Sequence, residues 1–277
     1  MTVGPTVAGA LREATTRLGT DWGRDEAEML MAHALGVARS AMLLGHMRAS
    51  PPEAFDAMLT RRLAGEPVAY ICGETEFFGR RFRVTPDVLI PRGDSEATVM
   101  AGLEVCGRSA RILDCGTGSG CLLLTLLAEL PEARGVGIDR SASALRVAAE
   151  NAEALGVAGR AEFSLGDWSE AGWAAGLGRF DLVITNPPYV EDDADLEACV
   201  RDYEPPGALF AGPEGLDDYW LLIPQLPALL AADGKAVCEI GHRQAGAVAP
   251  IAAAAGFATH LRHDLAGRAR ALILYRE

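Results

Sequence analysis

The sequence lacks several features that would point to a membrane-bound, secreted or metal-binding protein. No apolar run approaches the ~18 residues that a bilayer-spanning helix needs. The amino terminus has no basic stretch followed by an apolar block, so we expect no secretion signal. Six cysteines are present, but they form no Cys-x-x-Cys pair and none has a histidine nearby at metal-ligand spacing. We therefore expect a cytoplasmic protein with free thiols and no metal site.

Positive charge is also scarce. The chain has 25 Lys and Arg against 38 Asp and Glu, which gives a formal net charge of -13. Residues 93–277 account for all of this excess, with 14 basic and 27 acidic side chains. A nucleic-acid backbone is held mainly by clustered Lys and Arg, so this charge argues against DNA or RNA as the principal substrate. With 277 residues and 49% hydrophobic types, the chain is long enough for two globular domains.

Residues 1–75 have the periodicity of a helical domain. Apolar residues recur at three- and four-residue spacing in two segments, which gives each segment one apolar stripe. The stripe residues are Val7, Ala10, Leu11, Ala14 and Leu18, and then Phe55, Met58, Leu59 and Leu63. Asp25 with Glu28, and Ser50 with Glu53, have capping-box spacing and predict helix starts. We expect a small helical bundle that docks a partner; the alternative is a bundle that only packs on the rest of the chain.

Residues 76–92 interrupt the helical pattern. Two short β-type runs, EFFGRRFRV and VLIPR, follow each other here, with Gly79 between aromatic residues and arginines. This composition predicts a β-hairpin that links two domains.

Residues 93–277 alternate between strand and helix patterns. The expected strands are 111–115, 135–138, 161–165, 180–185, 235–240, 258–263 and 271–275, and the expected helices begin at Cys121 or cover 141–155, 217–230 and 243–255. Alternation of this kind predicts an α/β fold with a mainly parallel sheet. The last two strands are joined by only seven residues, DLAGRAR, which is too short for a crossover helix. We expect these two strands to pair antiparallel.

A glycine-rich loop lies between the first strand of this domain and its helix. The loop reads Asp-Cys-Gly-Thr-Gly-Ser-Gly over residues 114–120. Glycines allow a sharp turn and a close approach of a ligand to the backbone at the helix start. The spacing is G-x-G-x-G rather than the G-x-G-x-x-G that matches a pyrophosphate. The loop therefore predicts a nucleotide-type site, formed by Gly116, Thr117, Gly118, Ser119 and Gly120, without a dinucleotide signature.

Three side chains complete this predicted site. Asp139 ends the next strand, where a carboxylate can accept both ribose hydroxyls; the alternative is a helix cap near Ser141. Asp167 and Trp168 follow the third strand and offer a carboxylate for an adenine amino group and an indole face beside the ring; the alternative is a surface turn. A site for adenosine and ribose without pyrophosphate suggests S-adenosylmethionine and methyl transfer.

The tetrapeptide Asn186-Pro187-Pro188-Tyr189 follows a predicted strand, at the sheet edge where α/β proteins bind ligands. Two prolines make the loop stiff and leave carbonyl acceptors available. The Asn186 side-chain oxygen and the Pro187 carbonyl can hold both N–H bonds of a planar amide and aim its lone pair at a methyl donor, while Tyr189 can stack on the substrate. The methylated nitrogen is so acidic that its proton can leave to water, so no strong base is required. The alternative for this tetrapeptide is a rigid surface turn.

With these motifs, the chain resembles the bacterial peptide chain release factor glutamine methyltransferases. The resemblance covers nearly the whole chain and includes GEPVAYICGETEFFGRRFRVTPDVLIPR, DCGTGSG, FDLVITNPPYV, VRDYEPPGALFAGPEGLDDYW and DLAGRARALIL. It implies a helical substrate-docking domain at 1–75, a β-hairpin linker at 76–92 and a seven-stranded Rossmann-like methyltransferase domain at 93–277. It also implies methylation of the side-chain amide of the glutamine in the Gly-Gly-Gln motif of class I release factors. We expect the protein to be a monomer.

The resemblance carries over to individual residues. Gly116 to Gly120, Asp139, Trp168 and Asn186 would bind S-adenosylmethionine, and Asn186 to Tyr189 the substrate glutamine. The chain departs from the family pattern at three positions, Gly93 in place of proline, Ala211 in place of glycine and Trp220 in place of arginine. Three alternatives remain: a glutamine methyltransferase for a ribosomal protein, a DNA amino-methyltransferase, and a non-catalytic scaffold that binds the cofactor.

Overall fold

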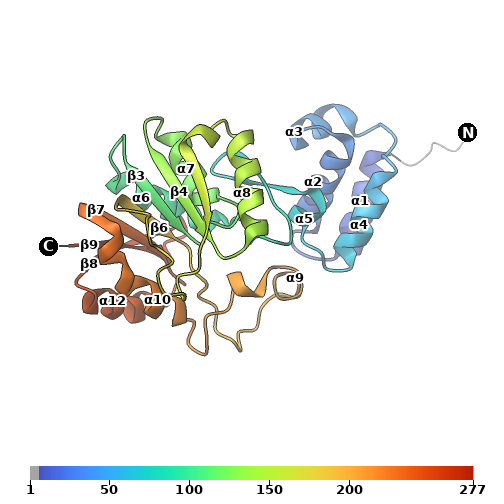
Figure 1. Cartoon of the computed structure of the whole chain (residues 1–277). Helices are drawn as coiled ribbons and strands as arrows, with labels where there is room; N and C mark the ends of the chain where they lie inside the picture. The colour runs from blue at the N-terminus through green and yellow to red at the C-terminus, as the bar shows by residue number, and fades with distance from the viewer. Residues whose placement is uncertain (1–5, 277) are drawn as a thin grey trace, which may run out of the picture. The chain divides into compact units, whose positions relative to one another are not determined.

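The computed structural model describes residues 6–276 (Figure 1). It divides into two compact units. One unit contains the chain up to Glu74 together with Leu196–Tyr203, and the other contains Thr75–Asp195 together with the chain from Glu204 onward. The segment Leu196–Tyr203 therefore leaves the second unit to pack with the first.

The first unit is helical. Its elements are α1 (Val7–Leu18), α2 (Gly23–Leu35), α3 (Arg39–Ala41), the π-helical turn η1 (Met42–His46), α4 (Ala54–Leu63), α5 (Val68–Cys72) and α9 (Ala198–Arg201). The predicted stripes form its core except for Leu63, which is 39% exposed. Val7, Leu11 and Ala14 of α1 belong to one buried cluster with Phe55 and Leu59 of α4. Among residues 6–276 no single helix is long and apolar enough to span a membrane. α2 and the following segment Arg39–His46 together have the length and composition of a membrane span, but they are bent by 92° relative to each other.

The predicted capping boxes in this unit are wrong. α2 begins two residues before Asp25, whose carboxylate pairs with Arg39. Glu28 is buried one turn further on and accepts a hydrogen bond from Arg39 Nε at 2.8 Å, so it does not return to the helix start. α4 begins after Glu53, and neither Glu53 nor Ser50 caps it with a side-chain bond. Ion pairs with Arg39 thus hold Asp25 and Glu28, and Glu28 also pairs with Arg24 one turn before it.

A two-stranded hairpin opens the second unit. It consists of β1 (Glu74–Phe77) and β2 (Arg80–Arg83). Phe78 and Gly79 form its turn with φ angles of 51° and 69°, the left-handed region that glycine favours. The first predicted β-type run is therefore a hairpin, whereas the second, 88–92, forms no strand.

Seven strands form the sheet of the second unit, in the order β5-β4-β3-β6-β7-β9-β8. They are β3 (Arg111–Cys115), β4 (Arg134–Asp139), β5 (Ala161–Leu165), β6 (Phe180–Thr185), β7 (Leu230–Glu239), β8 (Ala258–His263) and β9 (Ala269–Tyr275). β3 to β7 pair in parallel, and β9 is antiparallel to both β7 and β8. The seven-stranded α/β prediction and the antiparallel pairing of the last two strands are confirmed.

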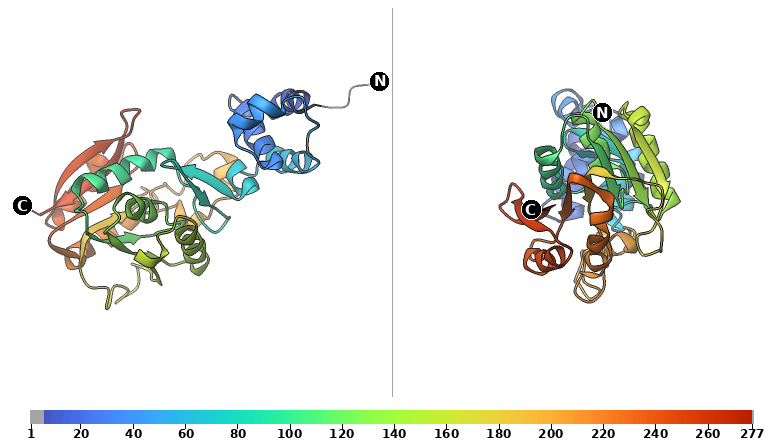
Figure 2. Two further views of the ribbon diagram at one scale, coloured as in Figure 1. Left: turned by 90° about the horizontal axis from the view of Figure 1, so that it is seen from above. Right: turned by 60° about the vertical axis from the view of Figure 1, so that its left-hand side comes forward.

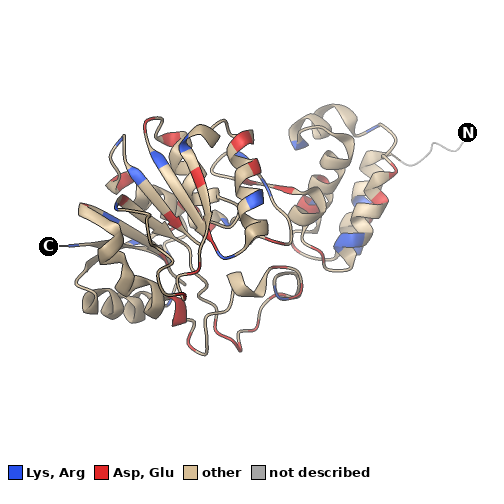
Figure 3. Cartoon of the chain, viewed as in Figure 1, with Lys and Arg blue, Asp and Glu red and all other residues tan. Residues whose placement is uncertain are grey.

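Helices cover both faces of this sheet. One face packs against α6 (Glu96–Val105), α7 (Cys121–Glu129) and α8 (Ala142–Ala154), and the other against α10 (Asp217–Leu222), α11 (Leu226–Leu229) and α12 (Ala245–Ala254). Side chains alternate between the two faces as the strand period requires; Ile112 packs with α7, and Leu113 with α10 and α12. α12 carries no charged residue, as its uniform tan colour in Figure 3 shows. Figure 2 gives two further views of these layers.

The helix predicted for residues 217–230 is divided into three pieces. α10 ends at Leu222, a 3-10 turn η5 covers Ile223–Gln225, and α11 follows. Pro224 and Pro227 each lie at the start of a piece, where proline needs no N–H partner. The region is helical as predicted, but the two prolines restart the helix. The other 3-10 turns are η2 (Gly93–Ser95), η3 (Ala158–Arg160) and η4 (Pro206–Ala208).

Gly93, which stands where the family pattern has proline, lies near the start of the second unit. It starts η2, a Cβ atom on it would meet no atom within 4 Å, and Arg92 before it is extended with ψ 142°. An extended residue is the conformation that precedes proline. Gly93→Pro should therefore raise the free energy of unfolding by about 0.5–1 kcal/mol, because it restricts the unfolded chain. Chemical denaturation measures this, with Gly93→Ala as the control that lacks the ring; a loss of stability in the proline variant alone would contradict the interpretation.

Candidate active site

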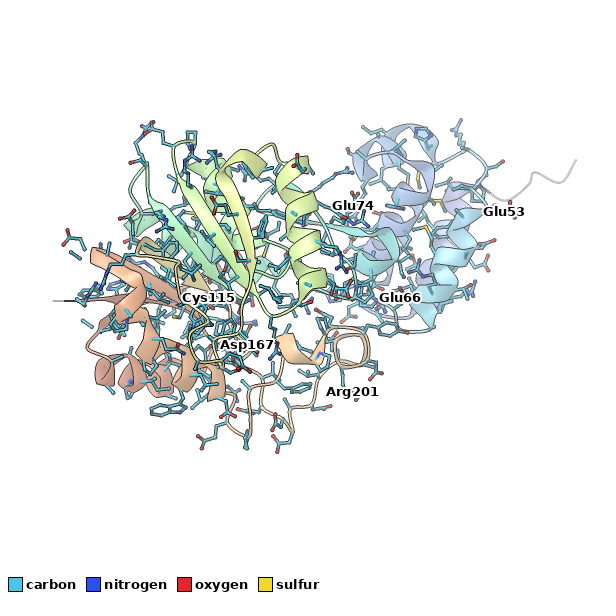
Figure 4. The ribbon with its side chains drawn as sticks, viewed as in Figure 1. Glu53, Glu66, Glu74, Cys115, Asp167 and Arg201 are labelled. Carbon is cyan, nitrogen blue, oxygen red and sulfur yellow. The ribbon has the colours of Figure 1, made fainter. Side chains whose placement is uncertain are left out.

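A cavity of about 290 Å³ lies where the loops after β3, β4, β5 and β6 meet. The carboxyl ends of these parallel strands point to the same edge of the sheet, which brings together loops that are far apart in sequence. Figure 4 labels Cys115 at the end of β3 and Asp167 in the loop after β5. Nine of the predicted site residues line the cavity: Gly116, Thr117, Gly118, Ser119, Asp139, Asp167, Trp168, Asn186 and Pro188. Gly120, Pro187 and Tyr189 are not among the lining residues.

The glycine loop leaves β3 in the left-handed conformation, with φ 75° at Gly116, 53° at Gly118 and 81° at Gly120. A Cβ atom on Gly116 would lie 3.1 Å from the indole ring of Trp168, so the loop can pass close under this ring only without a side chain. A Cβ atom on Gly120 would lie 2.7 Å from Leu124 of α7. Gly116 therefore shapes the cavity, while Gly120 allows the helix to pack against the loop.

Asp139 connects two backbone segments at the cavity. One of its carboxylate oxygens accepts from the amide of Gly118 at 2.9 Å, and the other from the amide of Ser141 at 2.9 Å. Ser141 itself caps α8 by accepting from Ala144 at 3.2 Å. Asp139 thus supports the start of α8 and also lines the cavity. Because the Gly118 amide already donates to a carboxylate, this loop is not arranged to hold a pyrophosphate.

Asp167 and Trp168 form one wall of the cavity. The indole Nε1 donates to Asp218 Oδ1 at 2.8 Å, which fixes the ring over Gly116. Asp167 Oδ1 accepts from the amide and the hydroxyl of Ser169 at 2.9 and 2.7 Å. These hydrogen bonds lower the pKa of Asp167, so it is ionised near neutral pH and can accept a bond from an amino group.

The Asn-Pro-Pro-Tyr loop presents Asn186 and Pro188 to the cavity. The Tyr189 ring packs against the core cluster of the α10 and α12 face, and burial raises its pKa to about 12. Its backbone oxygen accepts from Gln244 Nε2 at 3.0 Å, which anchors the end of the loop. Direct stacking of Tyr189 on a substrate stays a prediction, and the structure gives this residue a clear role in holding the loop.

Val190, the residue after Tyr189, anchors the same loop to the segment that contains Leu209 and Ala211. Its amide donates to the Leu209 carbonyl at 2.8 Å, and its carbonyl accepts from Ala211 at 2.9 Å. Ala211 is buried, and its backbone amide makes the second of these bonds whether the residue is glycine or alanine. Trp220, the other departure in this region, is 57% exposed and does not line the cavity.

Sequence reasoning missed the residues that roof the cavity. Glu204 is buried, accepts from the amide of Ile90 at 3.1 Å and pairs with Arg92. Arg140 donates to the backbone oxygen of Gly207 at 2.5 Å. A buried carboxylate beside two prolines in the segment YEPP was the available signal, but its partners lie more than 100 residues away. These bonds hold the segment Glu204–Ala208, here called the roof segment, whose residues Pro205, Gly207 and Ala208 line the cavity.

The charges of the cavity fit a cationic nucleoside better than a polyphosphate. Asp87, Asp139 and Asp167 line it, and the guanidinium groups of Arg92 and Arg140 are bound to Glu204 and to the Gly207 carbonyl. The Gly207 carbonyl is uncharged, so Arg140 keeps its positive charge, but three carboxylates still outnumber it in the lining. This balance repels phosphates and attracts a sulfonium or ammonium group. The residues present therefore fit S-adenosylmethionine.

Comparisons with known proteins agree with this geometry. Residues 107–219 match the family described as "Methyltransferase domain", and residues 9–73 match the "PrmC N-terminal domain". The chain is 45% identical to the release factor glutamine methyltransferase of Cereibacter sphaeroides, over 95% of this chain and 96% of that protein. It is 43% identical to the enzyme of the same name from Rhodospirillum rubrum, over 93% and 80%. A methyltransferase structure from Pyrococcus furiosus shares the fold, with a TM-score of 0.53 and 15% identity over 80% of this chain and 98% of that one.

Two glycines of the loop allow a matched test of the Trp168 contact. Gly116→Ala should lower the free energy of unfolding by about 2 kcal/mol, since it combines a strained φ with a clash against the indole. Gly118→Ala has a similar φ, but its Cβ meets no atom within 4 Å, so about 1 kcal/mol is expected from strain alone. Chemical denaturation with tryptophan fluorescence measures both. Equal losses would show that the indole moves away without cost.

Proposed function

This chain belongs to the release factor glutamine methyltransferase family, and from that premise we propose that it methylates the side-chain amide nitrogen of the glutamine in the Gly-Gly-Gln motif of class I release factors. The observation that carries the proposal is the shared cavity. Asn186 and Pro188, from the loop suited to hold a carboxamide, line the same space as the glycine loop and Asp139. Donor and acceptor sites are therefore contiguous.

The donor is S-adenosylmethionine, which supplies an electrophilic methyl group on a sulfonium sulfur when bound. Asp139 is placed to accept from ribose hydroxyls, and Asp167 from the adenine amino group. Trp168 offers a flat apolar face, held in place through Asp218. Gly116 to Gly120 leave room for the chain of the donor, and the surrounding carboxylates favour its positive charge.

The acceptor residues overcome the poor nucleophilicity of an amide nitrogen. Its lone pair is delocalised into the carbonyl group, and a fixed pair of acceptors can hold the nitrogen while the lone pair turns toward the methyl carbon. The Asn186 side-chain oxygen and the Pro187 carbonyl are these acceptors in our proposal. The anchoring of Tyr189 by Gln244 and of Val190 by Leu209 supports it, because a loop fixed at its end loses little freedom on binding.

Partner and location follow from the same proposal. We infer that the helical unit, Val7–Cys72 with α9, docks the release factor, and that the enzyme acts as a monomer in the cytoplasm, where translation takes place. A ribosomal protein as substrate is the related alternative. DNA is a poorer alternative, because the formal net charge of -13 disfavours a duplex.

Asn186→Ala is the direct test of the acceptor site. It should lower the rate of methylation of a purified release factor by 100-fold or more, roughly the loss expected for one oriented polar group. Affinity for S-adenosylhomocysteine should fall far less. Peptide mass analysis locates the added methyl group, and a release factor whose motif glutamine is replaced by alanine is the substrate control. Methylation of that control, of a ribosomal protein or of duplex DNA instead would reject the proposed substrate.

Asp139→Asn tests the donor site separately. The variant keeps the shape of the side chain but loses the charge and one acceptor for the ribose, and its amide group opposes the Gly118 amide. Binding of S-adenosylhomocysteine, measured by isothermal titration calorimetry, should weaken by about 10- to 100-fold, the value of a hydrogen bond to a charged group. Glu162→Gln, exposed on β5, is the control and should leave binding unchanged. Unchanged binding in Asp139→Asn would place the ribose elsewhere.

A further inference from the structure

A buried carboxyl group lies directly behind the cavity. Glu239 ends β7 and is 1% exposed. In the parallel pair of β6 and β7, Thr185 lies opposite Cys238, so the next residues along the two strands are Asn186 and Glu239. Cys238 packs on the α10 and α12 face, and Glu239 therefore points to the opposite face, toward α6. A buried carboxyl group beside a site is a candidate for a part in its chemistry.

Two hydroxyl groups hold this carboxyl group, and only one of them belongs to the cavity. Ser95 Oγ donates to Glu239 Oε1 and Thr98 Oγ1 to Glu239 Oε2, each at 3.0 Å. Ser95 lines the cavity together with Asn186 and Pro188. Thr98 is fully buried and is not among the lining residues. A single hydrogen bond, through Ser95, thus separates the cavity from the carboxyl group.

The groups that surround Glu239 leave it able to exchange a proton near neutral pH. Burial raises the pKa of Glu239 to about 7. The negative charge of Asp94 in η2 also raises this pKa. The hydrogen bonds from Ser95 and Thr98 and the positive charge of Arg270 on β9 act in the opposite direction and favour the ionised carboxylate. The other titratable groups that face it are Cys121 at the start of α7, Tyr189, and Tyr219, whose hydroxyl donates to the Glu239 backbone oxygen at 2.8 Å.

We propose that Ser95 and Glu239 form a relay that removes the proton from the newly methylated amide. The inference rests on the proposed glutamine methylation. As the bond between nitrogen and the methyl carbon forms, the bond from that carbon to sulfur breaks, and its electron pair stays on sulfur. The nitrogen proton passes to Ser95 Oγ, while the Ser95 hydroxyl proton moves along the existing hydrogen bond to Glu239 Oε1. The methylamide and the thioether end neutral, and Glu239 ends as a carboxylic acid that returns its proton to solvent between turnovers.

The relay replaces direct loss of the proton to water. In the incoming amide both N–H bonds point to Asn186 and Pro187; once the methyl group is on nitrogen, one of them turns to Ser95 Oγ, which lines the same cavity. The bound donor would fill the rest of the cavity, so this internal acceptor removes the need for an ordered water there. It also accounts for a carboxyl group in the apolar strand sequence AVCEI, where burial alone carries a free-energy cost.

Ser95→Ala and Thr98→Val are a matched pair that separates chemistry from packing. Each variant removes one 3.0 Å hydrogen bond to the same carboxyl group, but only Ser95 lines the cavity. The single-turnover rate at pH 7.5 should fall by about 100-fold in Ser95→Ala, within the range for general acid–base catalysis, and by less than about 3-fold in Thr98→Val. Calorimetric binding of S-adenosylhomocysteine should be the same in both. Equal rate losses in the two variants would mean that the carboxyl group is only structural and would overturn the relay.

The pH dependence provides a second, independent readout. The wild-type single-turnover rate should fall as the pH decreases through about 7, because Glu239 becomes protonated, and Glu239→Gln should be slow and lack this step. Infrared titration of the ligand-free chain should show a carboxyl band with a midpoint near 7 that is missing in Glu239→Gln. A midpoint between 4 and 5, or a variant with the wild-type profile, would overturn the relay. If the wild type methylates no release factor, the proposed function fails first; if it does and these signatures are missing, only the relay fails.

Discussion

The carboxylate of Asp139 fixes two backbone segments that the cavity needs. Its oxygens accept from the amides of Gly118, in the loop after β3, and Ser141, at the start of α8. One side chain can bridge these segments because β3 and β4 are parallel neighbours and end at the same edge. The charge that holds the loop is also the charge that a cationic donor meets. Folding of the loop and recognition of the donor therefore depend on the same group.

Local pattern predicted much of this fold because the relevant signals are short. The strands 111–115, 161–165, 180–185 and 258–263 were predicted with the bounds that β3, β5, β6 and β8 have. The apolar runs are strong, and turns or glycine loops bound them closely. The glycine loop, Asp139 and Asn186 were found for the same reason, since each directly follows a strand and the parallel order brings strand ends together.

Contacts between distant residues could not be read in this way. The partners of Glu239, Ser95 and Thr98, lie more than 140 positions away along the chain, and Arg92 lies 112 positions from Glu204. The residues next to a buried carboxyl group in the sequence do not indicate which distant hydroxyl or guanidinium group it will contact. Local patterns also failed at helix ends, where long-range pairs of Asp25 and Glu28 with Arg39 replaced the expected caps.

The path of the chain limits how its two units can be separated or exchanged. Leu196–Tyr203 packs with the helical unit, and the chain therefore passes between the units three times. Tyr203 anchors this segment, because its hydroxyl donates to the Ala64 carbonyl at 3.0 Å and its ring lies beside Gly65. Removal of the chain before Thr75 would leave α9 without its packing surface, directly before the roof segment. A functional chimera between relatives must therefore transplant both pieces together, so the helical unit cannot be swapped as a simple amino-terminal cassette.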